Sequence, residues 1–181
     1  MTIQHITCSF FQNFLRIVLH QLVEHITNND LELKQFAYRQ HHNTETALLH
    51  VTNCLLCNTD QGQVSILTVL DLFAAFDVIN HDILLMHLST IFGVPDLAFQ
   101  WLGSHITDRF MTFTVNDITL EPKRLDIGVP QGSVLRPLLF VLHTHPLSQI
   151  VLNSGLDLHK FSDNTQLFNS TPPTDFNPVS K

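Results

Sequence analysis

Three short segments carry the residue types that chemistry on phosphate groups needs. The first, Leu70–Asp77, ends an apolar run with the carboxylate of Asp71, and the second, Gly128–Ser133, is a polar turn flanked by two glycines. The third, Phe161–Asn164, presents Asp163 at the tip of a predicted hairpin. Converging carboxylates form a hard-oxygen site for magnesium. Two such ions can activate a hydroxyl and stabilise a leaving phosphate in an in-line displacement.

Strands must bring these carboxylates together. Val64–Leu72 is a β-branched and apolar run after a glycine, which predicts a buried strand. Two further strands are predicted over Leu156–Phe161 and Thr165–Phe168, on either side of the turn that holds Asp163. If the first strand neighbours these two, both Asp71 and Asp163 emerge at the same edge of one sheet.

Helices and strands are interleaved along the rest of the chain. Apolar residues recur in pairs every four positions from Phe10 to Ile26, which is typical of an amphipathic helix. The other predicted elements are helices from Asn43 or Thr44 to about Gly62, over His81–Phe92 with Asn80 as N-cap, from Pro95 onward and over Ser133–Ile150, a helical turn at Ala74–Asp77, and a hairpin of Arg109–Val115 and Ile118–Arg124. This mixture predicts an α+β domain over residues 1–169, followed by a loose tail over residues 170–181.

Composition narrows the class of protein. The chain has 181 residues, of which 44% are hydrophobic and 14% are charged, and its net charge is −7. That apolar content is too high for a disordered chain, and no apolar run approaches the ~18 residues of a membrane helix. The N-terminus lacks a signal-peptide pattern, so we expect an intracellular protein, cytoplasmic or nuclear, with no membrane partner. The acidic balance by itself argues against a strong grip on nucleic acid.

Cysteine and histidine offer a second possible chemistry. Cys54 and Cys57 form a single Cys-x-x-Cys inside a predicted helix, whereas a structural zinc site needs four ligands. Three cysteines without a secretory signal indicate a reducing compartment, and the 12 histidines are scattered. The simpler interpretation of the pair is two small side chains that face the core, and a zinc or redox protein stays as an alternative.

Five blocks follow one another in a recognisable order: Gln35–Arg39, Thr44–Leu49, Leu70–Asp77, Gly128–Leu135 and Asp163–Leu167. Together they resemble the reverse transcriptases of non-LTR, LINE-type retrotransposons, over about residues 10 to 170. The resemblance implies a right-hand polymerase fold and the copying of RNA into DNA. Its partners would be an RNA template, a DNA primer and deoxynucleotides, with Mg²⁺ as the cofactor. We expect a partial copy, an α+β fingers–palm fragment whose antiparallel palm sheet packs on helices, without a thumb and with no evident protein partner.

The resemblance also implies roles for single residues. Asp71 matches the first catalytic aspartate, which binds both metals, and Asp163 matches the first aspartate of the family's Tyr-Ala-Asp-Asp hairpin. Phe76 matches the aromatic steric gate, whose ring leaves no room for a 2′-hydroxyl. The expected metal ligands are therefore Asp71 and Asp163. The expected nucleotide-binding residues are Arg39, Leu72, Phe76, Gln131 and Gly132.

The sequence departs from the family pattern at several of these positions. Asn164 stands where the second hairpin carboxylate is expected, and it keeps one neutral oxygen acceptor while losing a full negative charge. We therefore expect polymerisation that is absent or very weak. Arg136 replaces a usual glycine and is expected to crowd the nucleotide pocket. His41 and His42 stand where a basic residue is common near Arg39.

Two other functional interpretations remain open. One is a catalytically dead remnant that still binds RNA or DNA, and the other is an inert pseudogene product. Single residues have plainer interpretations as well, since Phe76 would otherwise be ordinary core. Asp77 and Asp82 are expected to cap or orient the neighbouring helix.

Overall fold

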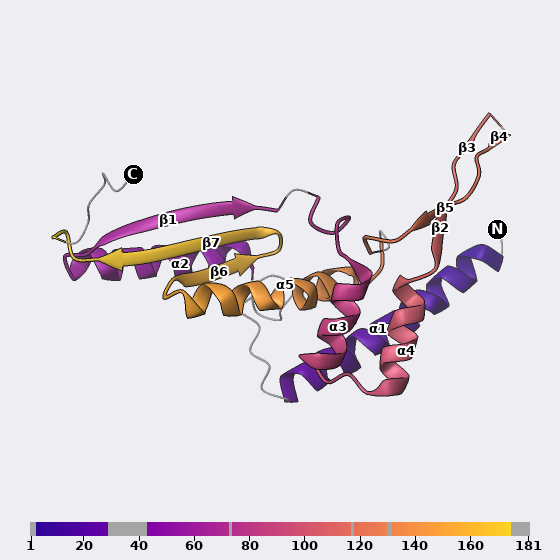
Figure 1. Ribbon diagram of the computed structural model, residues 1–181, viewed down its shortest axis with the longest axis horizontal. Helices are drawn as coiled ribbons and strands as arrows, with labels where there is room; N and C mark the ends of the chain where they lie inside the picture. Colours follow the sequence, from indigo (N-terminus) through magenta and orange to yellow (C-terminus); the bar gives the residue numbers. More distant parts are fainter. Residues whose placement is uncertain (1–2, 29–42, 73, 117, 130–131, 175–181) are drawn as a thin grey trace. The chain divides into compact units, whose positions relative to one another are not determined.

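The computed structural model describes residues 3–28, 43–72, 74–116, 118–129 and 132–174, with side chains from Phe11 onward (Figure 1). Predicted site residues Arg39 and Gln131, together with His41 and His42, lie outside these ranges. The chain divides into two compact units. Unit 1 comprises Met1–Glu32 and Ala74–His143, and unit 2 comprises Leu33–Phe73 and Thr144–Lys181.

The described elements form an α+β arrangement, as expected from the sequence. The helices are α1 (Ile3–Asn28), α2 (Thr44–Asp60), α3 (His81–Thr90), α4 (Asp96–Ile106) and α5 (Arg136–Asn153). The strands are β1 (Val64–Asp71), β2 (Arg109–Met111), β3 (Thr114–Val115), β4 (Ile118–Thr119), β5 (Lys123–Leu125), β6 (Asp157–Phe161) and β7 (Asn164–Thr171). No helix in the described ranges is long and apolar enough to span a membrane.

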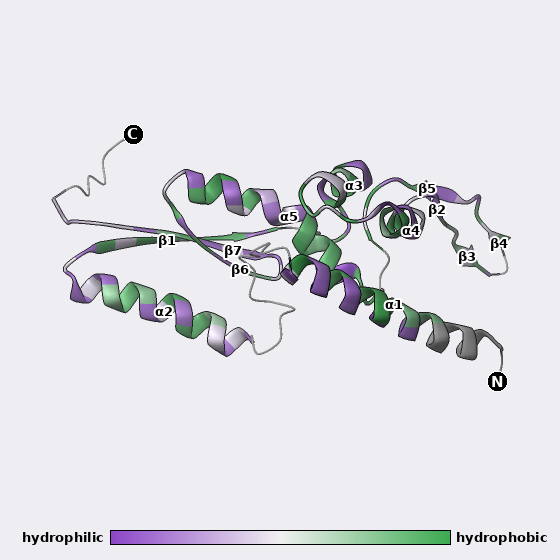
Figure 2. Ribbon diagram, turned by 90° about the horizontal axis from the view of Figure 1, so that it is seen from below, coloured by the Kyte–Doolittle hydropathy of each residue, from purple (hydrophilic) through white to green (hydrophobic). Residues whose placement is uncertain are grey.

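Unit 2 is built around a three-stranded antiparallel sheet of order β1-β7-β6. Helix α2 and the unit 2 part of α5 cover opposite faces of this sheet (Figure 2). On the α2 side, Asn58 donates a hydrogen bond to Ser170 Oγ at 2.6 Å, and the rings of His50 and His159 stack 5.6 Å apart. On the α5 side, Lys160 reaches the backbone and side chain of Thr144. Alternate residues along the strands thus contact α2 on one face of the sheet and α5 on the other.

Strand β1 lies at an edge of the sheet, which differs from the buried strand that its apolar run predicts. Ile66 is 51% exposed and Val69 is 56% exposed. Within the described part of the chain, β7 is the one strand that pairs with β1, so much of the side-chain surface of β1 is exposed. An apolar β-branched run fits an edge strand as well as a central one, because the pattern reports strand propensity and not the number of neighbours.

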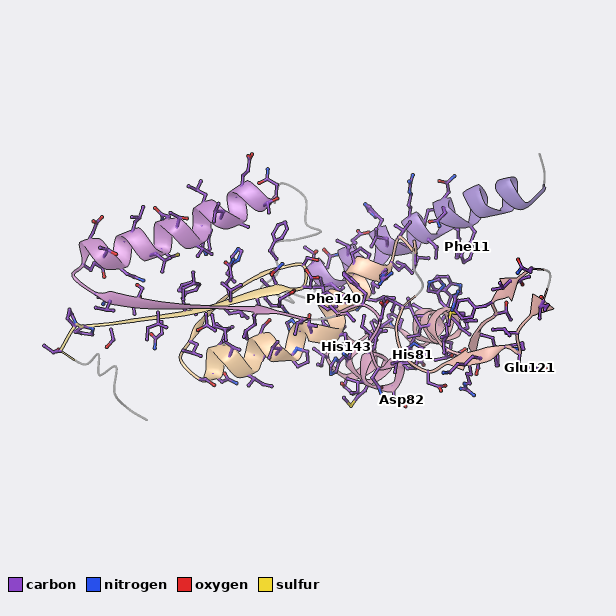
Figure 3. The ribbon with its side chains drawn as sticks, turned by 90° about the horizontal axis from the view of Figure 1, so that it is seen from above. Phe11, His81, Asp82, Glu121, Phe140 and His143 are labelled. Atoms are coloured by element: carbon purple, nitrogen blue, oxygen red, sulfur yellow. The ribbon has the colours of Figure 1, made fainter. Side chains whose placement is uncertain are left out.

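Unit 1 packs helices α1, α3, α4 and the beginning of α5 around one core. The ring of Phe14 on α1 meets Trp101 on α4 edge-on at 5.5 Å, and His25 on α1 donates to the carbonyl of Phe92 at 2.8 Å. The rings of His87 on α3 and His143 on α5 lie 5.9 Å apart (Figure 3 labels His143). The fully buried apolar residues of this unit include Leu15, Ile26, Leu84, Leu88, Phe92, Leu102, Ile106, Leu135, Leu139 and Phe140.

Local signals placed several element ends correctly. The side chain of Asn43 accepts from Thr46 N in a capping box that starts α2, and Asn80 accepts from Ile83 N at 3.0 Å at the start of α3. The predicted hairpin forms as two short ladders, β2–β5 and β3–β4 (Figure 1). Strand β7, in contrast, runs past its predicted end at Phe168 to Thr171.

Candidate active site

The end of β1 meets the beginning of β7. Asp71, the last residue of β1, is the register partner of Asn164, the first residue of β7. The ladder continues one step further, because Leu72 N donates to the carbonyl of Asp163 at 3.3 Å. Directly opposite residues of antiparallel strands project from the same face with Cβ atoms about 4.5–5.5 Å apart. The predicted convergence of Asp71 with the hairpin is thus what the strand pairing of unit 2 produces.

A tight turn presents Asp163. Phe161 and Asn164 pair across β6 and β7, which leaves Ser162 and Asp163 as a two-residue loop. Ser162 has φ = 57°, in the left-handed region that non-glycine residues rarely occupy. A positive φ at the first loop position is a feature of type I′ and type II′ turns, whose twist matches that of the flanking strands. Non-glycine residues in this conformation concentrate at functional sites.

A lysine supports this turn from the other face of the sheet. Lys160 is 2% exposed and its ammonium donates to Thr144 O and Oγ1, both at 3.0 Å, and to Ser148 Oγ at 3.4 Å. These three acceptors match the three protons of an ammonium group. Burial lowers the pKa of Lys160 to about 8. Sequence reasoning missed Lys160, although a lysine one position before Phe161 in a predicted strand is a visible signal.

A buried histidine lies on the same sheet face as Asp71 and Asn164. His159 is 1% exposed and pairs in register with Gln166, two positions from Asn164 along β7. Burial lowers the pKa of His159, the charge of His50 lowers it further, and a hydrogen bond with Gln166 acts in the opposite direction. The interior of this face therefore disfavours the charged form of His159.

The oxygen ligands suit a hard divalent cation, but their total charge is small. Asp71 and Asp163 each offer a carboxylate and Asn164 offers one amide oxygen, all donors that magnesium accepts. Among the described residues, no group of three or more His, Cys, Asp or Glu side chains is arranged to hold a metal ion. Cys54 and Cys57 are free thiols and Cys57 is exposed, so it does not face the core as its position in the helix suggested.

The remaining described site residues belong to unit 1, where Phe76 is half-buried between two side chains. Its ring centroid lies 4.8 Å from that of Phe140 and 4.8 Å from the guanidinium carbon of Arg136. Nη2 of Arg136 also donates to Asp77 Oδ1 at 2.9 Å. Asp77 thus binds Arg136, and the N-cap of the neighbouring helix α3 is Asn80 and not Asp77. Asp82 does lie in the first turn of α3.

The glycine-flanked segment Gly128–Ser133 belongs to unit 1, whereas the hairpin Phe161–Asn164 belongs to unit 2. Within unit 1, Val129 N donates to Phe76 O at 3.2 Å, and Gly128 N donates to Ile79 O at 2.8 Å. Gly128 has φ = +85°, and a Cβ there would lie 3.0 Å from the carbonyl oxygen of Asp77. Only glycine allows so close an approach of two backbones. Gly128 and Val129 are therefore fixed against the segment Phe76–Ile79.

Gly132 completes this loop in the described structure. It has φ = +75° and its carbonyl accepts a hydrogen bond from Gln12 Nε2 at 3.4 Å. An apolar cavity of about 670 Å³ also lies in unit 1, between α1 and α4, and its wall includes Phe14, Leu22 and Trp101. None of the predicted site residues lines this cavity.

Comparisons with known proteins agree with this geometry. The family model described as "Reverse transcriptase (RNA-dependent DNA polymerase)" matches residues 5–177. "Probable RNA-directed DNA polymerase from transposon BS" of Drosophila melanogaster is 33% identical over 113 residues, which cover 62% of this chain and 12% of the relative. "RNA-directed DNA polymerase from mobile element jockey" of Drosophila funebris is 33% identical over 110 residues, covering 61% and 12%. The chain thus spans about an eighth of the length of these curated relatives.

A solved structure extends the comparison to the fold. Apo telomerase from Candida tropicalis, truncated from its C-terminal domain, superposes with a TM-score of 0.63 at 16% sequence identity. The match covers 87% of this chain and 34% of the telomerase chain. At this identity the likeness concerns the fold alone.

Proposed function

Because the chain belongs to the reverse transcriptase family, we propose that Asp71, Asp163 and Asn164 form a nucleotidyl-transfer site that is inactive or very weak in this copy. The register pair of Asp71 with Asn164 is the observation that carries this proposal. It supports one convergent site at the end of two strands, and it sets an amide where the family has a carboxylate.

Each site residue has a distinct part in this proposal. Asp71 and Asp163 would hold a divalent cation through their carboxylates, and Asn164 would contribute an amide oxygen without charge. Bound magnesium would supply Lewis-acid stabilisation of the developing phosphate charge. In unit 1, the family resemblance gives Phe76 the part of the steric gate that excludes a 2′-hydroxyl, and it gives Gly132 a part in binding the nucleotide and the template.

Primer extension tests this assignment on the full chain. We expect Asn164→Asp to raise nucleotide incorporation by roughly tenfold or more, because about 1.4 kcal/mol of added transition-state stabilisation suffices for a factor of ten. Asn169→Asp is the matched control, since it adds the same charge to the same strand at an exposed residue of the opposite sheet face. Asp71→Asn in the Asn164→Asp background should abolish the gain.

Two results would contradict the proposal. An equal gain in Asn164→Asp and Asn169→Asp would indicate a bulk charge effect and not a site. No gain in Asn164→Asp would remove Asn164 as the sole defect and leave the second candidate, a remnant that binds template–primer without extending it. Asn164 itself favours that candidate, because an amide in place of a carboxylate weakens metal binding but removes no basic side chain that could contact phosphate. Its signature is binding that falls with salt concentration in the absence of extension.

A further inference from the structure

The ring of Phe76 contacts two side chains. Phe140, which is 1% exposed on α5, lies at a centroid distance of 4.8 Å with an interplanar angle of 44°. The guanidinium of Arg136 lies 4.8 Å from the ring centroid, within the range of a cation–π contact. Since Phe76 is only half-buried, part of its edge stays available to a ligand.

Arg136 is itself held in place. Its Nη2 donates to Asp77 Oδ1 at 2.9 Å, and its side chain is 17% exposed. Arg136 opens α5, and its backbone N donates to Ser133 O at 3.1 Å. Both the backbone and the far end of this side chain are therefore fixed, one by the helix start and the other by the residue after Phe76. A charge-assisted hydrogen bond of this length is among the stronger polar contacts in proteins.

Arg136 is already paired, so it is not a free cation that could bind phosphate without losing a contact. The charge of Arg136 is already balanced by Asp77, and its Nε is buried without a hydrogen-bond partner among the described residues. Leaving a buried donor unpaired costs stability, so hydrogen bonding alone does not explain why the side chain lies here. The contact of the guanidinium with the Phe76 ring adds a second attraction that holds it here. Arg136 thus lies against both Phe76 and Asp77.

We propose that Arg136 is a positioning residue for Phe76. It holds the ring against Phe140 in one orientation and thereby sets how strictly the site distinguishes deoxyribonucleotides from ribonucleotides. The inference rests on the proposed function, in which Phe76 is the steric gate. Glycine at this position would leave one side of the ring open and free to turn.

The experiment measures discrimination between ATP and dATP in two ways. The first is the ratio of their apparent Kd values on the full chain with template–primer and Mg²⁺. The second is the ratio of their kcat/KM values in the Asn164→Asp background. Arg136→Met keeps the length of the side chain without its charge, and it should lower discrimination by about three- to tenfold, the size expected of a lost cation–π contact. Asp77→Asn, an exposed position that carries little folding risk, should lower it less. Arg136→Lys should restore part of it.

Two reference variants sharpen the result. Phe76→Val removes the gate, so adding Arg136→Met to it should cause no further loss if Arg136 acts through the ring. Arg124→Met is the matched control, because Arg124 is an arginine of the same unit paired with Asp108 and Asp126. We expect it to leave discrimination unchanged.

The outcomes separate the inference from the proposed function. Unchanged discrimination in Arg136→Met, while Phe76→Val lowers it, overturns the inference and leaves the function standing. Equal losses from Arg136→Met with and without Phe76 also overturn it, because Arg136 would then act elsewhere. If the parent chain and Asn164→Asp bind neither nucleotide, the proposed function fails and the inference fails with it.

Discussion

Asp71 closes β1 directly opposite Asn164, which opens β7. A carboxylate therefore faces an amide at the place where two acidic side chains would repel one another. Like charges on directly opposite residues of antiparallel strands are destabilising, by roughly 0.2–1 kcal/mol. Asn164 thus relieves repulsion in the metal-free chain while it removes charge that a cation would need.

This trade-off makes a prediction about stability. Asn164→Asp should lower the melting temperature of the metal-free chain by about 1–3 °C and should increase the upward shift that Mn²⁺ or Mg²⁺ produces. Thermal unfolding with and without metal measures both effects. Asn169→Asp should show neither, and equal metal shifts in the two variants would contradict a shared ion site.

Gly128 makes a steric prediction. A Cβ at this position would lie 3.0 Å from Asp77 O, and the backbone has φ = +85°. Gly128→Ala should therefore lower the free energy of unfolding by about 2 kcal/mol or more, whereas Gly93→Ala should cost about 1 kcal/mol. Gly93 also has a positive φ but nothing within 4 Å of its added Cβ. Chemical denaturation measures the difference, and equal costs would show that the contact with Asp77 yields freely.

The buried Lys160 predicts that the free energy of unfolding rises at alkaline pH. Its pKa is lowered from 10.5 to about 8 in the folded chain, so the unfolded chain binds more protons between these values. The free energy of unfolding should then rise with pH from about 8 to 10.5, by up to about 3 kcal/mol relative to Lys160→Met. Burial also raises the pKa of the Cys54 thiol, which acts in the opposite direction but is shared by both proteins. Parallel pH profiles for parent and variant would contradict the prediction.

His159 predicts how the free energy of unfolding changes at acidic pH. Burial, followed by the charge of His50, lowers the pKa of His159 below 6.5 in the folded chain. The unfolded chain takes up the proton first, so stability should fall as the pH drops below 6.5. His159→Phe keeps a ring against His50 without a titrating group and should flatten this decline. The control is His20→Gln at a side chain that is 84% exposed, and a decline flattened as much by this change would argue against burial as the cause.

Much of the fold followed from local sequence signals. Asn43 and Asn80 mark helix starts through short side chains that reach nearby backbone N–H groups, a relation within four residues that any reader of the sequence can find. The hairpin around Asn116 is local in the same sense. The exposure of β1 is not local, because it depends on which strands lie beside it, and an apolar run carries no such information.

The candidate site likewise contains some residues that the sequence predicts and others that depend on contacts in space. Asp71 and Asp163 were predicted from ordered blocks, and strand pairing places the ends of those blocks side by side. The direction of the Arg136 side chain was not predictable, since it depends on Asp77 and Phe76 being close in space. Lys160 was missed for a similar reason, as its three acceptors lie on a helix that precedes its own strand.

The pairing of β1 with β7 also has a consequence for how the chain reaches its native state. Val64 pairs with Thr171, and the whole Ala74–His143 segment of unit 1 lies between the two strands in the sequence. During synthesis β1 has no β7 to pair with until the chain has been made as far as Thr171. Contacts between such distant residues close large loops and slow the folding reaction. Unit 2 is therefore expected to fold late, after the intervening segment of unit 1.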